Sequence, residues 1–314
     1  MGLSRRFLNL IVDNRIPGAK SLRCIDLTRQ QFFNTTTPAS PPNGSGSESE
    51  GPQDATAWAP AADARNQKNK QAEAVPLKIG MIRLPSPSFS FRASAMSFER
   101  CIDCFPLAPC KVLCADQSGR TFLFDADTRE VASMPDLHEP KFLPFSIFVP
   151  SADGDDHDDG TGSVYVMERF PEQELGGSRK PSYQFEAFVY RKSTLTSFTK
   201  SWHCQLLPPP PFVCDPKYWH SSRRPKISSY AVVKGVNGVS HVCISTDGAG
   251  TYCLDTMTHT WTQVGEWTLP FQGKVEYVPE LKLLFGISAK DQHLAAADLS
   301  TMDSATASGH LEGT

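Results

Sequence analysis

The hydrophobic and polar residues of this chain alternate in short runs with a period of two, which is typical of half-buried β-strands. Residues 7–34 predict two or three strands, with a turn from Asn14 to Gly18. A period of 3.6, which would indicate helices, is not found over a useful length. The pattern therefore predicts an all-β protein. After the N-terminal strands we expect four units: one over 101–134; a second with strands at 145–148, 163–167, 185–190 and 201–206; a third at 230–233, 241–245, 251–255 and 260–264; and a fourth at 274–278, 283–287 and 294–298.

Two of these units repeat one pattern at a spacing of 130 residues. A sheet unit that recurs in this way is typical of a β-propeller, in which one short antiparallel sheet is reused around an axis. We therefore expect the paired residues to occupy equivalent positions in separate sheets, with the two aspartates forming turns through their carboxylates. The pairs are Val112 and Val242, Phe122 and Tyr252, Phe124 and Leu254, Asp125 and Asp255, and Thr128 and Thr258.

The spacing of about 45–60 residues per unit is typical of kelch-like blades. We expect a β-propeller-like fold of about five short antiparallel blades, incomplete at the C-terminus. Residues 1–34 supply the N-terminal strands of the propeller and 77–300 form the repeat domain. Residues 301–314 are small and polar, and they predict a frayed tail.

Residues 35–76 predict a disordered insertion. The segment consists largely of Ser, Pro, Gly, Ala, Asn and Gln, with almost no large apolar side chains. Such a composition cannot bury enough surface to offset the entropy that ordering would cost.

Deletion of residues 35–75 is therefore expected to leave the thermal midpoint of unfolding nearly unchanged, as thermal denaturation of the purified deletion variant would show. A large fall in the midpoint would mean that the segment docks on the folded part.

The charge and the apolar runs limit the classes of partner. The formal net charge of −3 provides no overall field that would attract nucleic acid or an anionic membrane, so a nucleic-acid partner is not expected. The apolar run 7–12 is too short for a secretory signal, and no run approaches the roughly 20 residues that span a bilayer. We expect a cytoplasmic or nuclear protein, while Arg5, Arg6 and Arg15 leave an organelle transit peptide open.

Nine cysteines in a chain without a secretory signal favour reduced thiols over disulfides. Cys101, Cys104, Cys110 and Cys114 raise the alternative of a tetrahedral zinc site. Their spacing matches such a site weakly, and they lie among residues that predict strands. We interpret them as small buried hydrophobic groups, so that Cys104→Ala or Cys114→Ala would cost on the order of 1 kcal/mol.

Sequence motifs that indicate catalysis are lacking. The chain has no Gly-x-Ser-x-Gly, no Gly-x-x-x-x-Gly-Lys and no His-Glu-x-x-His. The acidic run 153–160 offers carboxylates to calcium, but Val166 stands where an EF-hand loop starting at Asp155 needs a closing Glu. We predict no catalytic residues, no cofactor and no bound metal.

One stretch interleaves aromatic and basic side chains and is our candidate partner-binding site. Such side chains can stack on a partner and neutralise its charge. The alternative is an ordinary exposed loop between blades. Nearby, Pro208 to Pro211 predict a polyproline II segment that joins two blades or, alternatively, serves as a ligand for an aromatic groove. The candidate residues are Tyr218, Trp219, His220, Arg223, Arg224 and Lys226.

Six segments together resemble a plant family that is much expanded in grasses, a domain of unknown function of the 1618 type. The resemblance covers most of the chain outside the insertion. It implies a propeller-like sheet protein, related in type to kelch-like and F-box-associated domains, and it implies no functional residues. Members of that family often continue beyond the point where this chain ends, which is why we expect the closing blade to be missing. The segments are 5–10, 114–119, 123–128, 206–212, 250–256 and 278–281.

These observations predict an interaction module whose partner is another protein. The sequence favours this function over that of an enzyme. One alternative is a substrate receptor related to F-box-associated domains. It would need a helical segment of about 40 residues ahead of the repeats, whereas this chain starts in a predicted strand. A second alternative is a pocket enzyme that uses the propeller axis, and it would need titratable groups that converge at one mouth of the ring.

Overall fold

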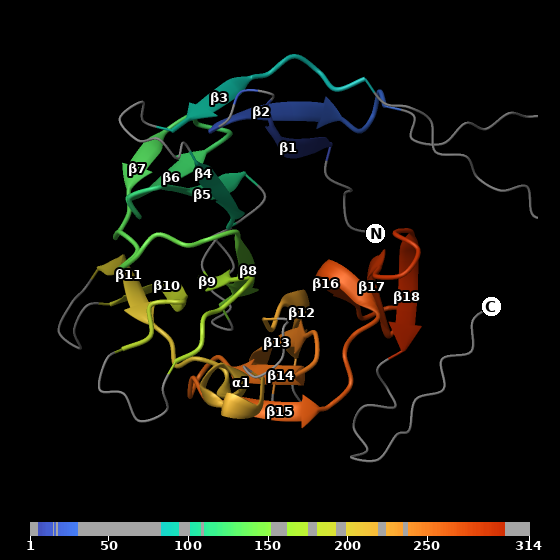
Figure 1. The fold of residues 1–314 in the computed structure, drawn as a ribbon. Helices are drawn as coiled ribbons and strands as arrows, with labels where there is room; N and C mark the ends of the chain where they lie inside the picture. The colour runs from blue at the N-terminus through green and yellow to red at the C-terminus, as the bar shows by residue number, and fades with distance from the viewer. Residues whose placement is uncertain are drawn as a thin grey trace, which may run out of the picture.

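The computed structural model shows short antiparallel sheets that follow one another around a common axis in chain order (Figure 1). It describes residues 6–14, 16, 18–30, 83–93, 101–107, 110–151, 162–174, 181–192, 199–218, 224–234 and 238–298. The expected all-β, propeller-like fold is confirmed. The expected insertion 35–76, the tail 301–314 and the acidic run 153–160 lie outside the described residues.

In the part of the chain that the structure describes, five strand units make up the ring. The first has the order β1-β2-β3, the next two are the four-stranded sheets β4 to β7 and β8 to β11, and the last two are β12 to β15 and β16 to β18. Within the described part of the chain, no strand of the first unit pairs with a strand of the last, and Figure 1 shows the ring open between them. The strands are β1 (Phe7–Asp13), β2 (Ala19–Asp26), β3 (Phe89–Arg92), β4 (Ile102–Pro106), β5 (Lys111–Asp116), β6 (Thr121–Asp125), β7 (Val131–Ser133), β8 (Pro144–Pro150), β9 (Gly162–Glu168), β10 (Phe185–Lys192), β11 (Lys200–Leu206), β12 (Ile227–Lys234), β13 (Ser240–Thr246), β14 (Gly250–Asp255), β15 (Trp261–Gly265), β16 (Phe271–Val278), β17 (Leu283–Ser288) and β18 (Leu294–Asp298).

The repeat found in the sequence is a structural repeat. Phe122 lies in β6 and Tyr252 in β14, each on the third strand of its unit. The backbone N–H groups of residues 127 and 128 donate to Asp125 Oδ1 at 2.9 and 3.2 Å, and those of residues 257 and 258 donate to Asp255 Oδ1 at 2.7 and 3.0 Å. Both turns close through a left-handed residue, Arg129 at φ 61° and His259 at φ 54°. The two aspartates therefore form the same turn, as predicted.

One pairing departs from a ring of separate sheets. β12 pairs in parallel with β16 through Ser229 to Ala231, so the last two units form a single seven-stranded sheet. The register between β16 and β17 shifts between Gln272 and Glu276, and Gly273 in this stretch has φ 80°. A glycine at such an irregularity lets the strand bend away from one partner, and here it turns β16 towards β12.

The core consists of apolar layers between neighbouring sheets. The alternation of β10 supplies two of these layers at once, because Phe185 packs towards β12 to β15 whereas Phe188 packs towards β4 to β7. A third layer joins the first two units around Leu22, Phe91 and Phe124. The inner strands β9 and β10 are therefore buried on both faces, which makes a charged side chain within them notable.

The cysteines follow the expectation only in part. Cys104 on β4 lies opposite Cys114 on β5, and Cys114 is fully buried, as expected for a small core residue. Cys101 and Cys110 stand immediately before these strands, and Cys101 is exposed. The expectation of reduced thiols is wrong for Cys243 and Cys253, which are directly opposed on β13 and β14 and form a disulfide. Direct opposition on neighbouring strands is necessary for such a bond but does not ensure it, because the opposed thiols of Cys104 and Cys114 remain 3.7 Å apart.

The link between β11 and β12 contains helical turns that the alternation did not predict. Pro210 has φ −59° and ψ 148°, the polyproline II conformation expected for the proline run, and it is followed by α1 (Pro211–Cys214) and the 3₁₀ turn η1 (Pro216–Tyr218). Proline at the first helical position is preorganised for a helix start. No helix in the described ranges is long and apolar enough to cross a membrane.

Candidate functional site

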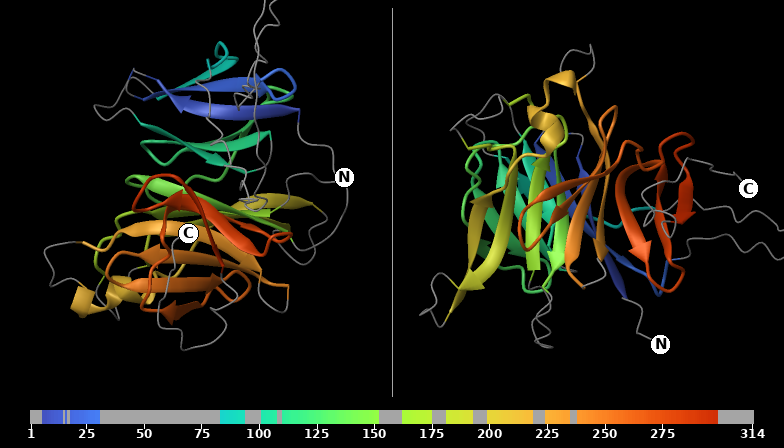
Figure 2. Two further views of the ribbon diagram at one scale, coloured as in Figure 1. Left: turned by 90° about the vertical axis from the view of Figure 1, so that its right-hand side faces the viewer. Right: turned by 90° about the horizontal axis from the view of Figure 1, so that it is seen from below.

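The turns and links at one end of the ring are joined into a continuous surface, which we call the loop end. It comprises residues 117–120, 134–143, 169–174 and 207–218. Backbone hydrogen bonds join these segments in two pairs, Leu137 N to Gly119 O at 2.9 Å and Glu174 N to Val213 O at 3.2 Å. Ile227 N, at the start of β12, donates to Arg169 O at 3.0 Å. Figure 2 shows α1 projecting from this end. The opposite end carries the turns after β6 and β14.

The link 134–143 is fixed to the sheets at both of its flanks. On one side, the hydroxyl of Thr121 donates to the carbonyl oxygen of Pro135 at 2.6 Å, and the backbone N–H of Thr121 donates to Asp136 Oδ1 at 3.0 Å. The side chains of Met134 and Leu137 are buried in the layer between the second and third units. On the other side, the link is held by a charge within the core.

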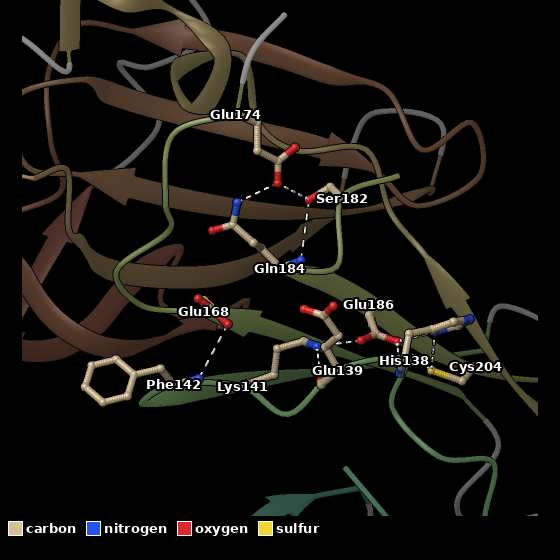
Figure 3. Close-up of polar contacts among 10 residues, drawn as sticks. All are labelled: His138, Glu139, Lys141, Phe142, Glu168, Glu174, Ser182, Gln184, Glu186 and Cys204. Atoms are coloured by element: carbon tan, nitrogen blue, oxygen red, sulfur yellow. Dashed lines mark hydrogen bonds and ion pairs between the residues drawn. The ribbon is translucent and has the colours of Figure 1, made fainter. Parts of the chain in front are cut away.

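That charge is Glu186, which lies on β10 and is fully buried. By the strand alternation it shares a face with Phe188, so its carboxylate enters an otherwise apolar layer. Lys141 Nζ contacts its Oε1 at 2.5 Å, and His138 donates to its Oε2 through the backbone N–H at 3.1 Å and through Nδ1 at 2.6 Å. The thiol of Cys204 donates to Oε2 at 3.1 Å (Figure 3). We call these four residues the Glu186 cluster.

The protonation states of the cluster limit its chemistry. Burial alone would raise the pKa of Glu186, but hydrogen bonds from Lys141 and His138 outweigh it and hold this pKa below the usual value. Burial, together with the nearby Glu186 charge, raises the pKa of the Cys204 thiol. The cluster thus holds an ionised carboxylate and a protonated thiol. An ionised carboxylate cannot act as a general acid, and a protonated thiol is not an activated nucleophile.

Next to the cluster, two apolar side chains project into solvent. Phe142 is 67 % exposed and Leu143 is 56 % exposed. Leu143 has φ 47°, a left-handed conformation that costs a non-glycine residue about 1–2 kcal/mol. The other non-glycine residues with positive φ in the described residues, Arg129, His259, Lys282 and Gln292, stand in hairpin turns, where this conformation is ordinary. Leu143 stands in a link between sheets.

A second polar network ties the loop between β9 and β10. Glu174 Oε1 accepts from Ser182 Oγ at 2.6 Å and from Gln184 Nε2 at 2.5 Å (Figure 3). Oε1 of Gln184 also accepts from the backbone N–H of Glu172 at 2.5 Å, and Nε2 of Gln184 donates to the carbonyl oxygen of Glu172 at 2.9 Å. Burial raises the pKa of nearby Glu168, which accepts from the N–H of Phe142 at 3.5 Å. These contacts connect the link at Phe142 with β9, and the segment 172–174 with Ser182 and Gln184.

The structure describes three of the six predicted partner-binding residues, while Trp219, His220 and Arg223 lie outside the described residues. Tyr218 is partly buried against the core, and its hydroxyl bonds to Tyr252, whose pKa is raised by burial and by that bond. Arg224 lies 3.6 Å from Glu172, with both side chains more than two-thirds exposed. Lys226 is half-buried. The three belong to the loop end or adjoin it, and their role in binding stays a prediction.

A cavity of about 260 Å³ lies between the first two units rather than at the axis. Its lining includes Lys20, Cys104 and Cys110. Lys20 Nζ is already paired with Asp13 Oδ1 at 2.6 Å. The cavity therefore brings together no set of groups with an evident reaction.

Reasoning from the sequence missed the Glu186 cluster. One signal was present: Glu186 interrupts the apolar strand from Phe185 to Tyr190, where a charge needs a partner. Lys141 and His138 are 45 and 48 residues away from Glu186 in sequence and Cys204 is 18 residues away, so only the fold identifies them as partners.

Comparison with solved structures gives remote matches. The β-propeller domain of Cps50 (Swd1) from Myceliophteria thermophila is 15 % identical over 62 % of this chain and 49 % of that chain, with a TM-score of 0.36. The extracellular domain of a one component system from B. thetaiotaomicron is 10 % identical over 68 % of this chain and 28 % of that chain, with a TM-score of 0.31. The chain thus spans about half the length of the first and less of the second.

No curated protein matches the chain. A family model does match, and it is not of the 1618 type that the sequence motifs suggested. The model covers residues 5–312, and the chain belongs to the family described as protein of unknown function DUF1668.

Proposed function

We propose that this chain is a propeller-like interaction module and that its partner is another protein, bound at the loop end. The observation that carries the proposal is the exposed pair Phe142 and Leu143 on a link that buried groups hold in place. Exposed apolar residues are common on protein surfaces, so exposure by itself does not identify a site. The combination of exposure, anchoring and a left-handed leucine does distinguish this pair.

The physical reason is preorganisation. An aromatic side chain that a partner covers is a frequent centre of binding energy, and binding costs less when its backbone is already fixed. Lys141, the neighbour of Phe142, has a side chain only 1 % exposed and an ion pair with Glu186, which fixes the backbone at this point. Backbone strain of the kind seen at Leu143 persists only where the surrounding structure imposes it, and it concentrates at functional sites.

The charges around the link favour a protein over a nucleic acid. Glu139, three residues before Phe142 in the same link, is exposed, and the exposed Arg224 is paired with Glu172. A surface of mixed sign does not neutralise a row of phosphates, whereas it suits the polar rim around an apolar contact. We extend the surface to the predicted set Tyr218, Trp219, His220, Arg223, Arg224 and Lys226, and we propose that binding takes place in the cytoplasm or nucleus.

The test is affinity purification of the tagged full chain from its own tissue, with Phe142→Asp compared with Met257→Asp. Met257 is 76 % exposed in the turn after β14, at the opposite end of the ring, so it is a matched control. We expect a protein that co-purifies with the wild type and with Met257→Asp. Its affinity for Phe142→Asp should fall about 30-fold or more, the effect of losing a hot-spot side chain of about 2 kcal/mol.

Equal recovery of that protein with both variants would contradict binding at the loop end. Thermal unfolding of the variants serves as the control for folding, because substitutions at exposed positions change stability by only about 0.5 kcal/mol. A substrate-receptor role would appear in the identity of the co-purified protein, as a component of a ubiquitin ligase.

A further inference from the structure

Three side chains of the Glu186 cluster present different metal-ligating atoms to one another. Oε2 of Glu186 lies 2.6 Å from His138 Nδ1 and 3.1 Å from Cys204 Sγ, and the sulfur lies 3.9 Å from Nδ1. Within the described ranges this is the one group of three or more His, Cys, Asp or Glu residues whose ligand atoms all lie within 4.8 Å of one another. Figure 3 shows the imidazole and the thiol turned towards the same side of the carboxylate.

The separations fit a small tetrahedral ion. Zinc binds nitrogen at about 2.0–2.1 Å, carboxylate oxygen at about 2.0–2.2 Å and sulfur at about 2.3 Å, which places the ligand atoms of a tetrahedral site about 3.3–3.6 Å apart. The three observed separations bracket these values. Insertion of the ion therefore requires Oε2 and Nδ1 to separate by about 0.7–0.9 Å, while the two distances to the sulfur change by about 0.3–0.5 Å, in side chains that already face one another.

The two oxygens of Glu186 have separate partners, so Lys141 does not compete with an ion for Oε2. Lys141 Nζ contacts Oε1 at 2.5 Å with both side chains buried, so the carboxylate is oriented before any ion arrives. Outer contacts of this kind hold the ligands of established metal sites in position. An ion would replace the imidazole N–H and the thiol, a weak hydrogen-bond donor, at Oε2, while the backbone N–H of His138 stays bonded to this oxygen.

The site is also accessible. The side chain of His138 is 40 % exposed while that of Glu186 is fully buried, so an ion can enter from solvent beside the imidazole. Three protein ligands leave a fourth position for water or for a group from a bound molecule, as in open zinc sites.

We propose that His138, Glu186 and Cys204 bind one zinc ion at the loop end, with an open fourth position. Binding releases the thiol proton to solvent, and the neutral imidazole of His138 carries its proton on Nε2 so that Nδ1 is free to ligate. The thiolate and Glu186, which also pairs with Lys141, supply the negative charge that faces the ion. The proposal departs from the sequence analysis, which predicted no metal, and it does not involve Cys101, Cys104, Cys110 or Cys114. It is also independent of the proposed protein partner.

The test is calorimetric titration of the purified full chain with zinc chloride after removal of metal by a chelator. We expect one ion per chain. Cys204→Ser keeps a hydrogen-bond donor to Glu186 but removes the thiolate, and it should weaken zinc binding by roughly 100-fold or more, because loss of an outer contact alone costs about 10–100-fold. Cys104→Ser is the matched control and should bind as the wild type does.

Cobalt(II) provides a second readout, because a thiolate ligand gives an absorption band that the wild type and Cys104→Ser should show and Cys204→Ser should lack. His138→Ala, at an exposed position that keeps the backbone N–H to Glu186, should weaken binding like Cys204→Ser and guards against misfolding of one variant. Absence of binding by the wild type, or equal binding by Cys204→Ser, would overturn the proposal. These measurements contain no partner protein, so their outcome is separate from that of the proposed function.

Discussion

Glu186→Gln is expected to lower the free energy of unfolding by about 3–5 kcal/mol, the usual effect of removing one partner from a buried ion pair. The change keeps the size and shape of the side chain, so no cavity arises. It leaves the ammonium of Lys141, whose side chain is 1 % exposed, without a counter-charge inside the protein. Urea denaturation of the purified variant measures the loss.

Two further variants separate the charge from other effects. Glu172→Gln removes a carboxylate whose ion pair with Arg224 is exposed, and such pairs contribute about 0–1 kcal/mol. Glu186→Gln combined with Lys141→Met removes both buried charges and should recover most of the lost stability. A loss below about 1 kcal/mol for Glu186→Gln would show that the pair acts like a surface pair.

The same ion pair predicts a dependence on pH. Because the pKa of Glu186 is lowered in the folded protein, its contribution is fully present above the ordinary glutamate pKa of about 4.3 and is lost as the pH falls through the folded value. The stability difference between wild type and Glu186→Gln should therefore be constant near neutral pH and shrink below about pH 4. A difference that grows on acidification would contradict the assignment of an ionised Glu186.

Gly250→Ala is expected to destabilise the protein by about 1–3 kcal/mol more than Gly248→Ala. Both glycines have left-handed backbones, at φ 94° and φ 79°, so both substitutions cost about 1–2 kcal/mol for conformation. A Cβ at 248 would point into open space, whereas a Cβ at 250 would press on the carbonyl oxygen of Gly265 and lie 2.9 Å from the Cα of Glu266. Backbone atoms cannot move aside as a flexible side chain would.

Urea denaturation of the two variants side by side measures this difference. The comparison also tests the packing of β14 on β15, because the close approach occurs where the register between these strands shifts, next to Thr251 and Tyr252 of β14. Equal losses would mean that the two strands are not packed as described.

The strand positions were predictable because they follow from local alternation. The runs around Phe122 and Tyr252 carry a period of two and end in the same aspartate turn, so their equivalence needs no knowledge of the fold. The parallel pairing of β12 with β16 was not predictable, because it depends on a register shift near Gly273. The pairing of Cys243 with Cys253 likewise depends on which strand residues face each other.

The candidate site was less predictable than the fold. Its parts come from the link 134–143 and from β10 and β11, and what joins them is the burial of Glu186 against that link. The left-handed conformation of Leu143 has no signal in the sequence, because leucine is not a residue that favours it. The interleaved aromatic and basic side chains selected residues 218–226, of which Tyr218, Arg224 and Lys226 lie in the loop end or adjoin it, and their role in binding stays a prediction.

The most direct test of a protein-binding loop end is photo-crosslinking with a benzophenone amino acid placed at position 142 or at position 257 of the full chain. Both positions are exposed, at 67 % and 76 %, and they lie at opposite ends of the ring. When the chains are illuminated in their own tissue, we expect a discrete crosslinked protein from position 142 and none from position 257. Crosslinking to the same protein from position 257 alone, or equally from both, would contradict the account.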